Sequence, residues 1–217
     1  MGRAKAPVAA AGQRDGRWAQ VSLTRVEGLV LAAGHSSRAG GPKALARLDG
    51  RTLLARAVET LRAGGCAEVT VVVGAAPGAH TNELEAVASG ARVVRNEAVD
   101  RGMLWSLQLG LRAAQPRAPD AVVVSLVDHP HVTADTVRAL LGRLGGAALA
   151  RPTLRGERGH PFVLGAQALD PVLAAAAAGR DVVTVEGLAP LHRKAGGQGV
   201  DPVQDAFDKS GALQCGF

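Results

Sequence analysis

The sequence predicts a three-layer α/β/α domain built around a mostly parallel sheet. Short apolar runs recur along the chain without alternating polar residues, which is typical of strands that are buried on both faces. Amphipathic segments of helical period separate these runs, and this order is that of β-α-β units. With 217 residues, of which 47 % are hydrophobic and 20 % charged, the chain has the composition of one globular domain.

The predicted strands and helices alternate from residue 28 onward. Thr52 is a suitable N-cap for the first helix, which Gly64-Gly65 ends, and Thr133 is a suitable N-cap for the fourth. Asp49-Gly50 predicts a turn just before the first helix. The predicted strands are residues 28–33, 69–73, 92–95, 121–127, 147–151 and 162–164. The predicted helices are residues 53–61, 81–89, 103–114, 134–144 and an alanine-rich segment that ends at 178.

The two ends of the chain differ from this pattern. Residues 1–25 carry five basic residues and one acidic residue, which predicts a basic, loosely ordered extension before a single domain at 26–217. From Gly179 onward the alternation degrades, and three glycines lie within residues 196–199. Residues 179–217 are therefore expected to form a loop and a short tail.

Composition excludes several classes of function. Aromatic residues make up only 2 % of the chain and most of the net charge of +6 lies in residues 1–25, so a nucleic-acid partner is not expected. No apolar run approaches the roughly 18–20 residues that cross a bilayer, so no membrane partner is expected either. Two cysteines are too few for a disulfide framework, which favours a cytoplasmic protein.

The first candidate site is the loop after the first strand, residues 31–43, with the sequence LAAGHSSRAGGPK. Its glycines allow backbone N–H groups to approach an anion, and Arg38 and Lys43 add positive charge. Lys43 is the one lysine between Lys5 and Lys194, in a chain that otherwise uses arginine. We predict that this loop holds a polyphosphate.

Two common phosphate-binding motifs do not match this loop. A P-loop needs glycine before the lysine and serine or threonine after it, but Pro42 and Ala44 stand there. A dinucleotide fingerprint needs Gly-x-Gly, which Gly34-His35-Ser36 does not supply. A plain surface loop is the remaining alternative.

The second candidate site is the end of the strand at 121–127, which continues as Val127-Asp128-His129-Pro130. Ligands of an open parallel sheet bind outside the carboxyl ends of its strands, and we expect Asp128 to project there. A carboxylate in this place can hold Mg²⁺ against phosphate oxygens. The alternative is a turn-forming aspartate before His-Pro.

Four segments resemble the MobA-like NTP transferases. In chain order they are LAAGHSSRAGGPK at 31–43, NEAVDRGMLWSLQLGL at 96–111, LVDHP at 126–130 and GERGHPFVL at 156–164. The family usually has Gln where His129 stands. The resemblance covers about residues 26–175. Within the family, Ala32-Ala33-Gly34 and the Gly-His-Pro segment are similar to the branch that makes molybdopterin cytosine dinucleotide from CTP.

The resemblance implies a Rossmann-like nucleotidyltransferase fold and an enzyme that moves a nucleoside monophosphate from an NTP to a phosphorylated acceptor, releasing pyrophosphate. In the similar branch the NTP is CTP, the acceptor is molybdopterin, and a molybdoenzyme that receives the product is a further partner. The implied cofactor is Mg²⁺. The implied site residues are catalytic Arg38, Lys43 and Asp128; nucleotide-binding Leu31, Ala32, Ala33, Gly34, Ser36, Ser37, Arg38, Lys43, Asn96 and Ser106; and acceptor-binding Gly102 and His160.

The carboxyl-terminal segment departs from the family's pattern. The family carries an aspartate there that is a second metal ligand, but GVDPVQDAFDK at 199–209 matches that segment poorly. Asp205 is the candidate for this ligand beside Asp128, and Asp201 and Asp208 are the alternatives.

Two other functions stay open from the sequence. The divergent end would leave a catalytically impaired protein that binds a nucleotide or delivers a cofactor without transferring anything. Asp128, His129 and His131 have the spacing of a metal-ligand cluster, which would make a zinc-type hydrolase. The hydrolase would leave the glycine-rich loop unexplained.

Overall fold

A six-stranded sheet forms the centre of the molecule. A computed structural model describes residues 23–34, 43–75, 90–154 and 157–175. Within these ranges the strand order is β5-β4-β1-β6-β10-β7. The strands are β1 (Val26–Ala32), β4 (Glu68–Gly74), β5 (Arg92–Asn96), β6 (Ala121–Leu126), β7 (Leu149–Ala150) and β10 (Phe162–Gly165). The first four pair in parallel, and β10 runs antiparallel to both β6 and β7. The prediction of a mostly parallel sheet is confirmed.

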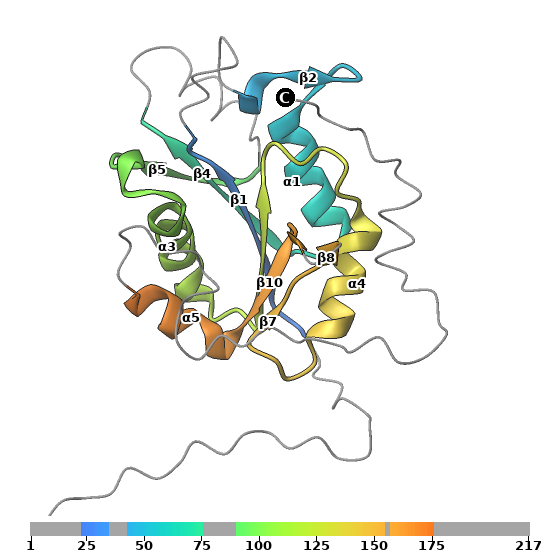
Figure 1. Ribbon diagram of the computed structural model, residues 1–217, viewed down its shortest axis with the longest axis vertical. Coiled ribbons are helices and arrows are strands. Elements are labelled where there is room, and N and C mark those ends of the chain that lie inside the picture. Colours follow the sequence, from blue (N-terminus) through green and yellow to red (C-terminus); the bar gives the residue numbers. More distant parts are fainter. Residues whose placement is uncertain (1–22, 35–42, 76–89, 155–156, 176–217) are drawn as a thin grey trace, which may run out of the picture.

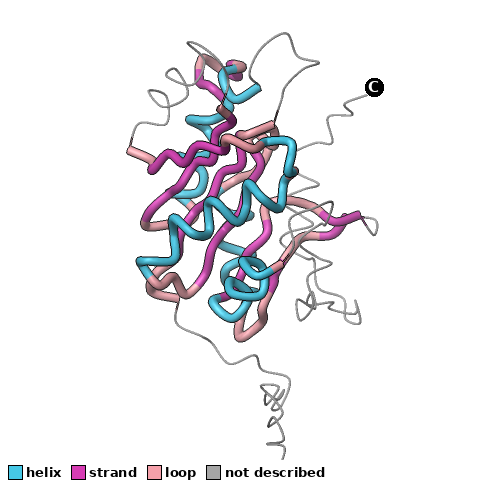
Figure 2. Tube along the Cα trace, turned by 90° about the vertical axis from the view of Figure 1, so that its left-hand side faces the viewer, coloured by secondary structure: helices cyan, strands magenta, loops and turns pink. Residues whose placement is uncertain are grey.

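Helices cover both faces of this sheet. Figure 1 shows α1 and α4 on one side and α3 and α5 on the other, and Figure 2 shows the same layers from a view turned by 90°. Each pair of helices packs over its own apolar core. The three-layer architecture is therefore also confirmed. The helices are α1 (Leu53–Ala63), α3 (Met103–Ala114), α4 (Ala134–Leu144) and α5 (Ala166–Ala174).

The local helix signals are confirmed. The Thr52 hydroxyl accepts a hydrogen bond from the Ala55 N–H at 3.1 Å, and the Thr133 hydroxyl accepts one from Thr136 at 3.2 Å, so both threonines are N-caps. The predicted turn joins β2 (Arg47–Leu48) to β3 (Arg51–Thr52). Its two central residues, Asp49 and Gly50, have φ angles of 52° and 78°, as a tight hairpin of type I′ requires.

The prediction for residues 147–160 was partly wrong. The strand expected at 147–151 shortens to Leu149–Ala150, because only these two residues pair with β10. The stretch before His160, expected to be irregular, contains a hairpin of β8 (Thr153–Leu154) and β9 (Glu157–Arg158). The helix predicted at 81–89 lies outside the described residues.

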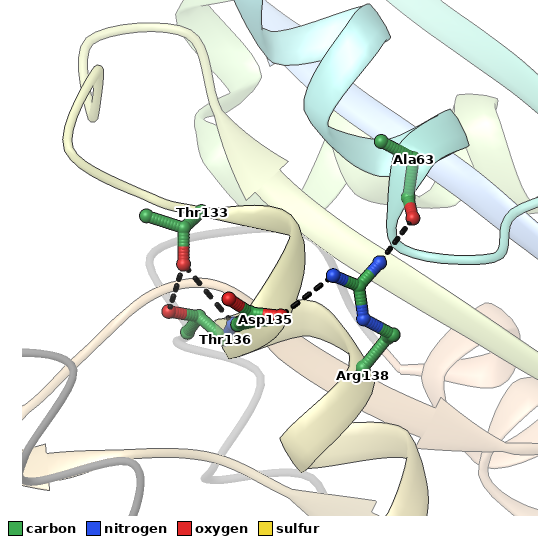
Figure 3. Close-up of polar contacts among 5 residues, drawn as sticks. All are labelled: Ala63, Thr133, Asp135, Thr136 and Arg138. Carbon is green, nitrogen blue, oxygen red and sulfur yellow. Dashed lines mark hydrogen bonds and ion pairs between the residues drawn. The ribbon is translucent and has the colours of Figure 1, made fainter.

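A guanidinium joins the two helices on one face of the sheet. Arg138 of α4 donates to the Ala63 carbonyl oxygen at the end of α1 at 2.5 Å, and to the Asp135 carboxylate at 2.6 Å (Figure 3). It thereby satisfies one of the carbonyls that a helix end leaves without an intrahelical partner. A Cβ on Gly64, the next residue, would lie 2.5 Å from a methyl carbon of Val137. This glycine lets α1 and α4 approach closely.

A second glycine sets the distance between α3 and the sheet. A Cβ on Gly110 of α3 would lie 2.3 Å from a methyl carbon of Leu29 on β1. Real side chains do not reach such distances, so any larger residue would push the helix away from the strand. The second half of α3 is thus held close to the middle of β1.

Asp120 fastens the chain before β1 to the chain before β6. Its Oδ2 atom accepts hydrogen bonds from the backbone N–H groups of Thr24 and Arg25 and from the Thr24 hydroxyl, each at 2.9 Å. These hydrogen bonds lower the pKa of the Asp120 carboxyl to about 2. The bond from the Arg25 N–H has the largest effect, followed by those from Thr24. Thr24 and Arg25 therefore belong to the folded domain, whose amino-terminal boundary was predicted at residue 26.

We expect Asp120 to stabilise the protein at neutral pH and not in strong acid. Its pKa is lower in the folded chain than the ordinary value of 3.8, so its stabilisation is fully present above about pH 4 and is lost as the pH falls through about 2. Urea unfolding of the parent protein and of Asp120→Asn tests this. The parent should be the more stable at pH 6, and the gap should close near pH 2; a gap that is the same at both pH values contradicts the assignment.

No helix in the described part of the chain is long and apolar enough to cross a membrane.

Candidate active site

The candidate site lies at the carboxyl edge of the parallel strands, near the hairpin labelled β2 in Figure 1. Because β1, β4, β5 and β6 are parallel, their carboxyl ends meet at the same edge. Gly34 follows β1, Asn96 ends β5, and Asp128 follows β6. Three of the predicted segments thus arrive at one edge.

Lys43 and Asp128 come together at this edge. The Lys43 Nζ atom lies 3.5 Å from the Asp128 Oδ2 atom, and the two side chains are 49 % and 42 % exposed. Lys43 opens a short 3₁₀ turn, Lys43–Leu45, whose next residue, Ala44, is buried in the core. This buried neighbour holds the lysine at the edge. Both charges remain accessible to a ligand from solvent.

At the end of β1 a ligand can reach backbone groups but few side-chain atoms. Leu31 and Ala33 are buried, each at 8 % exposure, and Ala32 packs partly against the opposite core. Gly34 is exposed, and a Cβ there would meet nothing within 4 Å. Leu31 and Ala32 pair with β4 in the sheet, and the Leu31 carbonyl oxygen accepts a hydrogen bond from the Val127 N–H at 3.2 Å. What this segment can give a nucleotide is therefore the backbone N–H and C=O groups of Ala33 and Gly34. Ser36, Ser37 and Arg38 lie outside the described residues.

Asn96 and Ser106 are bonded to each other inside the fold. The Asn96 Nδ2 atom donates to the Ser106 hydroxyl at 2.9 Å, and the Ala98 N–H donates to the Asn96 Oδ1 atom at 2.9 Å. Both side chains are buried. They tie the end of β5 to the first turns of α3. Between them, Gly102 has a φ of 86° and is exposed at the start of α3, a conformation that favours glycine.

Two histidines extend the edge beyond Asp128. The His129 Nε2 atom lies 3.9 Å from the Asp128 Oδ1 atom. The ring of His160 lies edge-on to the ring of His129, with centroids 5.5 Å apart, and 5.4 Å from the ring of Phe162. The sequence did not predict this contact, because it gave no sign that the strand starting at Phe162 runs antiparallel to β6.

The Asp128 carboxylate fits a metal ion that binds together with the phosphates of a nucleotide. Among the described residues no three His, Cys, Asp or Glu side chains are grouped to hold a metal, so Asp128, His129 and His131 do not form a zinc site. Mg²⁺ in nucleotide sites takes one or two carboxylates and fills its other positions with phosphate oxygens and water. Asp128 fits that demand as one carboxylate. Asp205, the predicted second ligand, lies outside the described residues, as do Asp201 and Asp208.

Comparison with known proteins gives the family. The MobA-like NTP transferase domain matches residues 28–200, which is most of the chain. This chain belongs to the MobA-like NTP transferase family. Solved structures of nucleotidyltransferases share the Rossmann-like fold described above, so the predicted fold and family are both confirmed.

Relatives within this family carry different activities in their names. Nicotine blue oxidoreductase from Paenarthrobacter nicotinovorans is 39 % identical over 171 residues, covering 72 % of this chain and 78 % of that protein. A "Probable molybdenum cofactor guanylyltransferase" from Opitutus terrae is 36 % identical over 113 residues, covering 52 % of each chain. This chain therefore aligns with about half the length of the guanylyltransferase.

A solved structure of the same fold contains manganese. Rv0371c from Mycobacterium tuberculosis, in complex with manganese, superimposes with a TM-score of 0.58 and 25 % identity over 70 % of this chain and 77 % of that one.

Proposed function

We propose that this MobA-like NTP transferase moves a cytidine monophosphate unit from CTP to a phosphorylated acceptor, with molybdopterin as the first candidate, and releases pyrophosphate. The observation that carries the proposal is the approach of Lys43 to Asp128, 3.5 Å apart and both accessible at the carboxyl edge of the sheet. One side chain supplies a cation for phosphates, and the other a carboxylate for the metal that accompanies them.

The reaction needs positioning and charge neutralisation more than covalent chemistry. A phosphate oxygen of the acceptor forms a bond to the α-phosphorus of the triphosphate, and the bond from that phosphorus to the β-phosphate oxygen breaks. The electron pair of the broken bond leaves with pyrophosphate. Lys43, with the backbone amides of the glycine-rich loop and Arg38, is assigned to neutralise the triphosphate and the growing charge on pyrophosphate.

Asp128 is the residue that would hold Mg²⁺. The ion would supply further neutralisation of the phosphate oxygens. The Lys43 ammonium lies 3.5 Å from the Asp128 carboxylate and balances its charge. A bound triphosphate with its metal would give each of these side chains a new partner of opposite charge. Asp205 remains the proposed second ligand.

The choice of CTP and molybdopterin rests on sequence. Ala32-Ala33-Gly34 and the Gly-His-Pro segment at 159–161 are similar to the cytidylyl branch of the family. The Opitutus relative is named for the molybdenum cofactor, which supports the acceptor but names guanylyl transfer. A molybdoenzyme that accepts the product is the corresponding protein partner.

Asn96, Ser106 and Gly102 are assigned to the same nucleotide and acceptor edge. Because the side chains of Asn96 and Ser106 are buried and bonded to each other, we assign them to hold residues 97–102 in place. The exposed backbone at Gly102 is then the part of this segment that a ligand can reach.

A screen of the four nucleoside triphosphates for pyrophosphate release tests the proposal. Each is incubated with Mg²⁺ and, in turn, molybdopterin, a sugar phosphate and a polyol phosphate. Pyrophosphate release that needs both CTP and molybdopterin is the expected result. Tight CTP binding without pyrophosphate release from any acceptor would contradict transfer and indicate a nucleotide-binding or cofactor-delivery protein instead.

The Paenarthrobacter relative favours a second candidate, an oxidoreductase. It is 39 % identical to this chain over 72 % of this chain's length. A reduced nicotinamide dinucleotide carries paired phosphates that could bind the same glycine-rich edge. Loss of the absorbance of NADH or NADPH in the presence of a dye acceptor, under conditions in which CTP gives no pyrophosphate, would favour this activity over nucleotidyl transfer.

A further inference from the structure

A row of rings and cations continues from Asp128 along the edge of the sheet. His129 follows Asp128 after the end of β6, His160 lies two residues before Phe162, the first residue of β10, and Arg151 follows β7. His129 contacts His160, His160 contacts Phe162, and the Arg151 guanidinium carbon lies 5.4 Å from the centre of the Phe162 ring. Three different strands therefore contribute to one polar row.

The direction of β10 creates this row. Phe162 pairs with Val124 in the antiparallel ladder, and continuing that register places His160 beside Leu126, close to Asp128. β7 is antiparallel to β10 and so parallel to β6, which brings Arg151 to the same edge as Asp128. The arrangement depends on one reversed strand at the end of an otherwise parallel sheet.

The chemistry of the row suits an anion. Each imidazole carries an N–H donor in its neutral form, and Arg151 adds a permanent positive charge behind the rings. The Asp128 carboxylate lies beside the row: its Oδ1 atom is 3.9 Å from the His129 Nε2 atom, and its Oδ2 atom is 3.5 Å from the Lys43 ammonium. Because Lys43 balances this carboxylate, an anion beside His129 does not meet an uncompensated negative charge.

We propose that His129 joins His160, the residue already predicted to bind the acceptor, in binding the phosphate of the acceptor. This inference rests on the proposed nucleotidyl transfer and deepens it. Lys43 and His129 approach different oxygens of the same Asp128 carboxylate. The triphosphate on the Lys43 side and the acceptor phosphate on the His129 side are then neighbours across Asp128.

Phenylalanine substitutions test the N–H donors of His129 and His160 separately from the packing of their rings. His129→Phe and His160→Phe keep the aromatic contacts of the row but remove the N–H groups that would bind phosphate. His129→Gln restores a donor at the first position. His131→Phe is the matched control, because His131 is an exposed histidine on the same loop.

Inorganic phosphate is the probe, and the side-chain NMR signals of the histidines are the readout. The full-length protein is titrated with phosphate at constant pH and ionic strength, with chloride as the reference salt. Phosphate should shift the signals of His129 and His160 and leave that of His131 in place. Each Phe variant in the row should bind phosphate about tenfold more weakly, the cost of one charge-assisted hydrogen bond, and His129→Gln should recover most of the loss.

The proposal fails if His129→Phe and His160→Phe bind phosphate as tightly as His131→Phe does. It also fails if the phosphate response disappears in Lys43→Ala but survives in both Phe variants, since the anion would then belong to the nucleotide site. Neither measurement requires transfer to occur, so the outcome stays separate from the pyrophosphate screen. Where transfer is measured, His129→Phe should raise the KM for the acceptor about tenfold and leave the KM for CTP unchanged.

Discussion

Replacing Asp128 by alanine is expected to abolish pyrophosphate release, and replacing Lys43 by alanine is expected to reduce it strongly. Asp128→Ala removes the carboxylate assigned to the metal, and Lys43→Ala removes a cation assigned to the leaving pyrophosphate. Groups that stabilise developing charge contribute about 10²–10³ in rate each, so kcat/KM should fall by at least about that factor in either variant. Initial rates of pyrophosphate release with CTP and Mg²⁺ measure the effect.

The same two substitutions should leave the fold intact. The side chains are about half exposed, and an exposed ion pair stabilises a protein by no more than about 1 kcal/mol. Thermal unfolding of each variant should therefore match the parent closely. Glu59→Ala is the control, because Glu59 is also half exposed and ion-paired, to Arg51. Parent-like transfer by Asp128→Ala, or an equal loss of activity in Glu59→Ala, would remove the assignment of this edge as the catalytic site.

Replacing Arg117 by methionine is expected to destabilise the protein by about 3 kcal/mol or more, since it leaves the buried Glu27 carboxylate without its partner. Glu27 lies on β1 with a side chain only 5 % exposed. Arg117 donates to both of its oxygens, at 2.5 and 2.6 Å, from the 3₁₀ turn Gln115–Arg117. The hydrogen bond to Glu27 raises the pKa of Arg117 above its usual value. Urea unfolding of the two proteins measures the difference.

The partner of this ion pair supplies the control. A double variant, Glu27→Leu with Arg117→Met, removes both charges and should recover part of the stability lost in Arg117→Met. A double variant that is no more stable than Arg117→Met would show that the loss of the charge pair with Glu27 does not account for the destabilisation. Glu27 also affects a neighbouring cysteine. Burial raises the pKa of the Cys66 thiol to about 12, and the Glu27 charge adds to this effect.

Local signals in the sequence were enough to place most of the fold. The bounds of α3 match the prediction at both ends, and Thr52 and Thr133 cap the helices they were expected to cap. These features depend on residues only a few positions apart, so no knowledge of distant contacts is needed. The same holds for Asp49-Gly50, whose turn follows from the backbone preferences of two neighbours.

The candidate site was predictable only in part. The rule that parallel strands end at one edge led to Lys43 and Asp128 as facing groups, and the structure brings them within 3.5 Å. The rule gives no side-chain partners. For that reason it did not show that Asn96 and Ser106 are buried and bonded to each other.

The amino-acid order alone determined the alternation of strands and helices, the helix caps, and the arrival of Lys43 and Asp128 at the carboxyl edge of the sheet. Only the tertiary structure decided that β10 is reversed and that His160 therefore stands against His129. The physical reason is that apolar periodicity reports burial but not strand direction. Direction and register depend on which distant strand supplies the partner N–H and C=O groups.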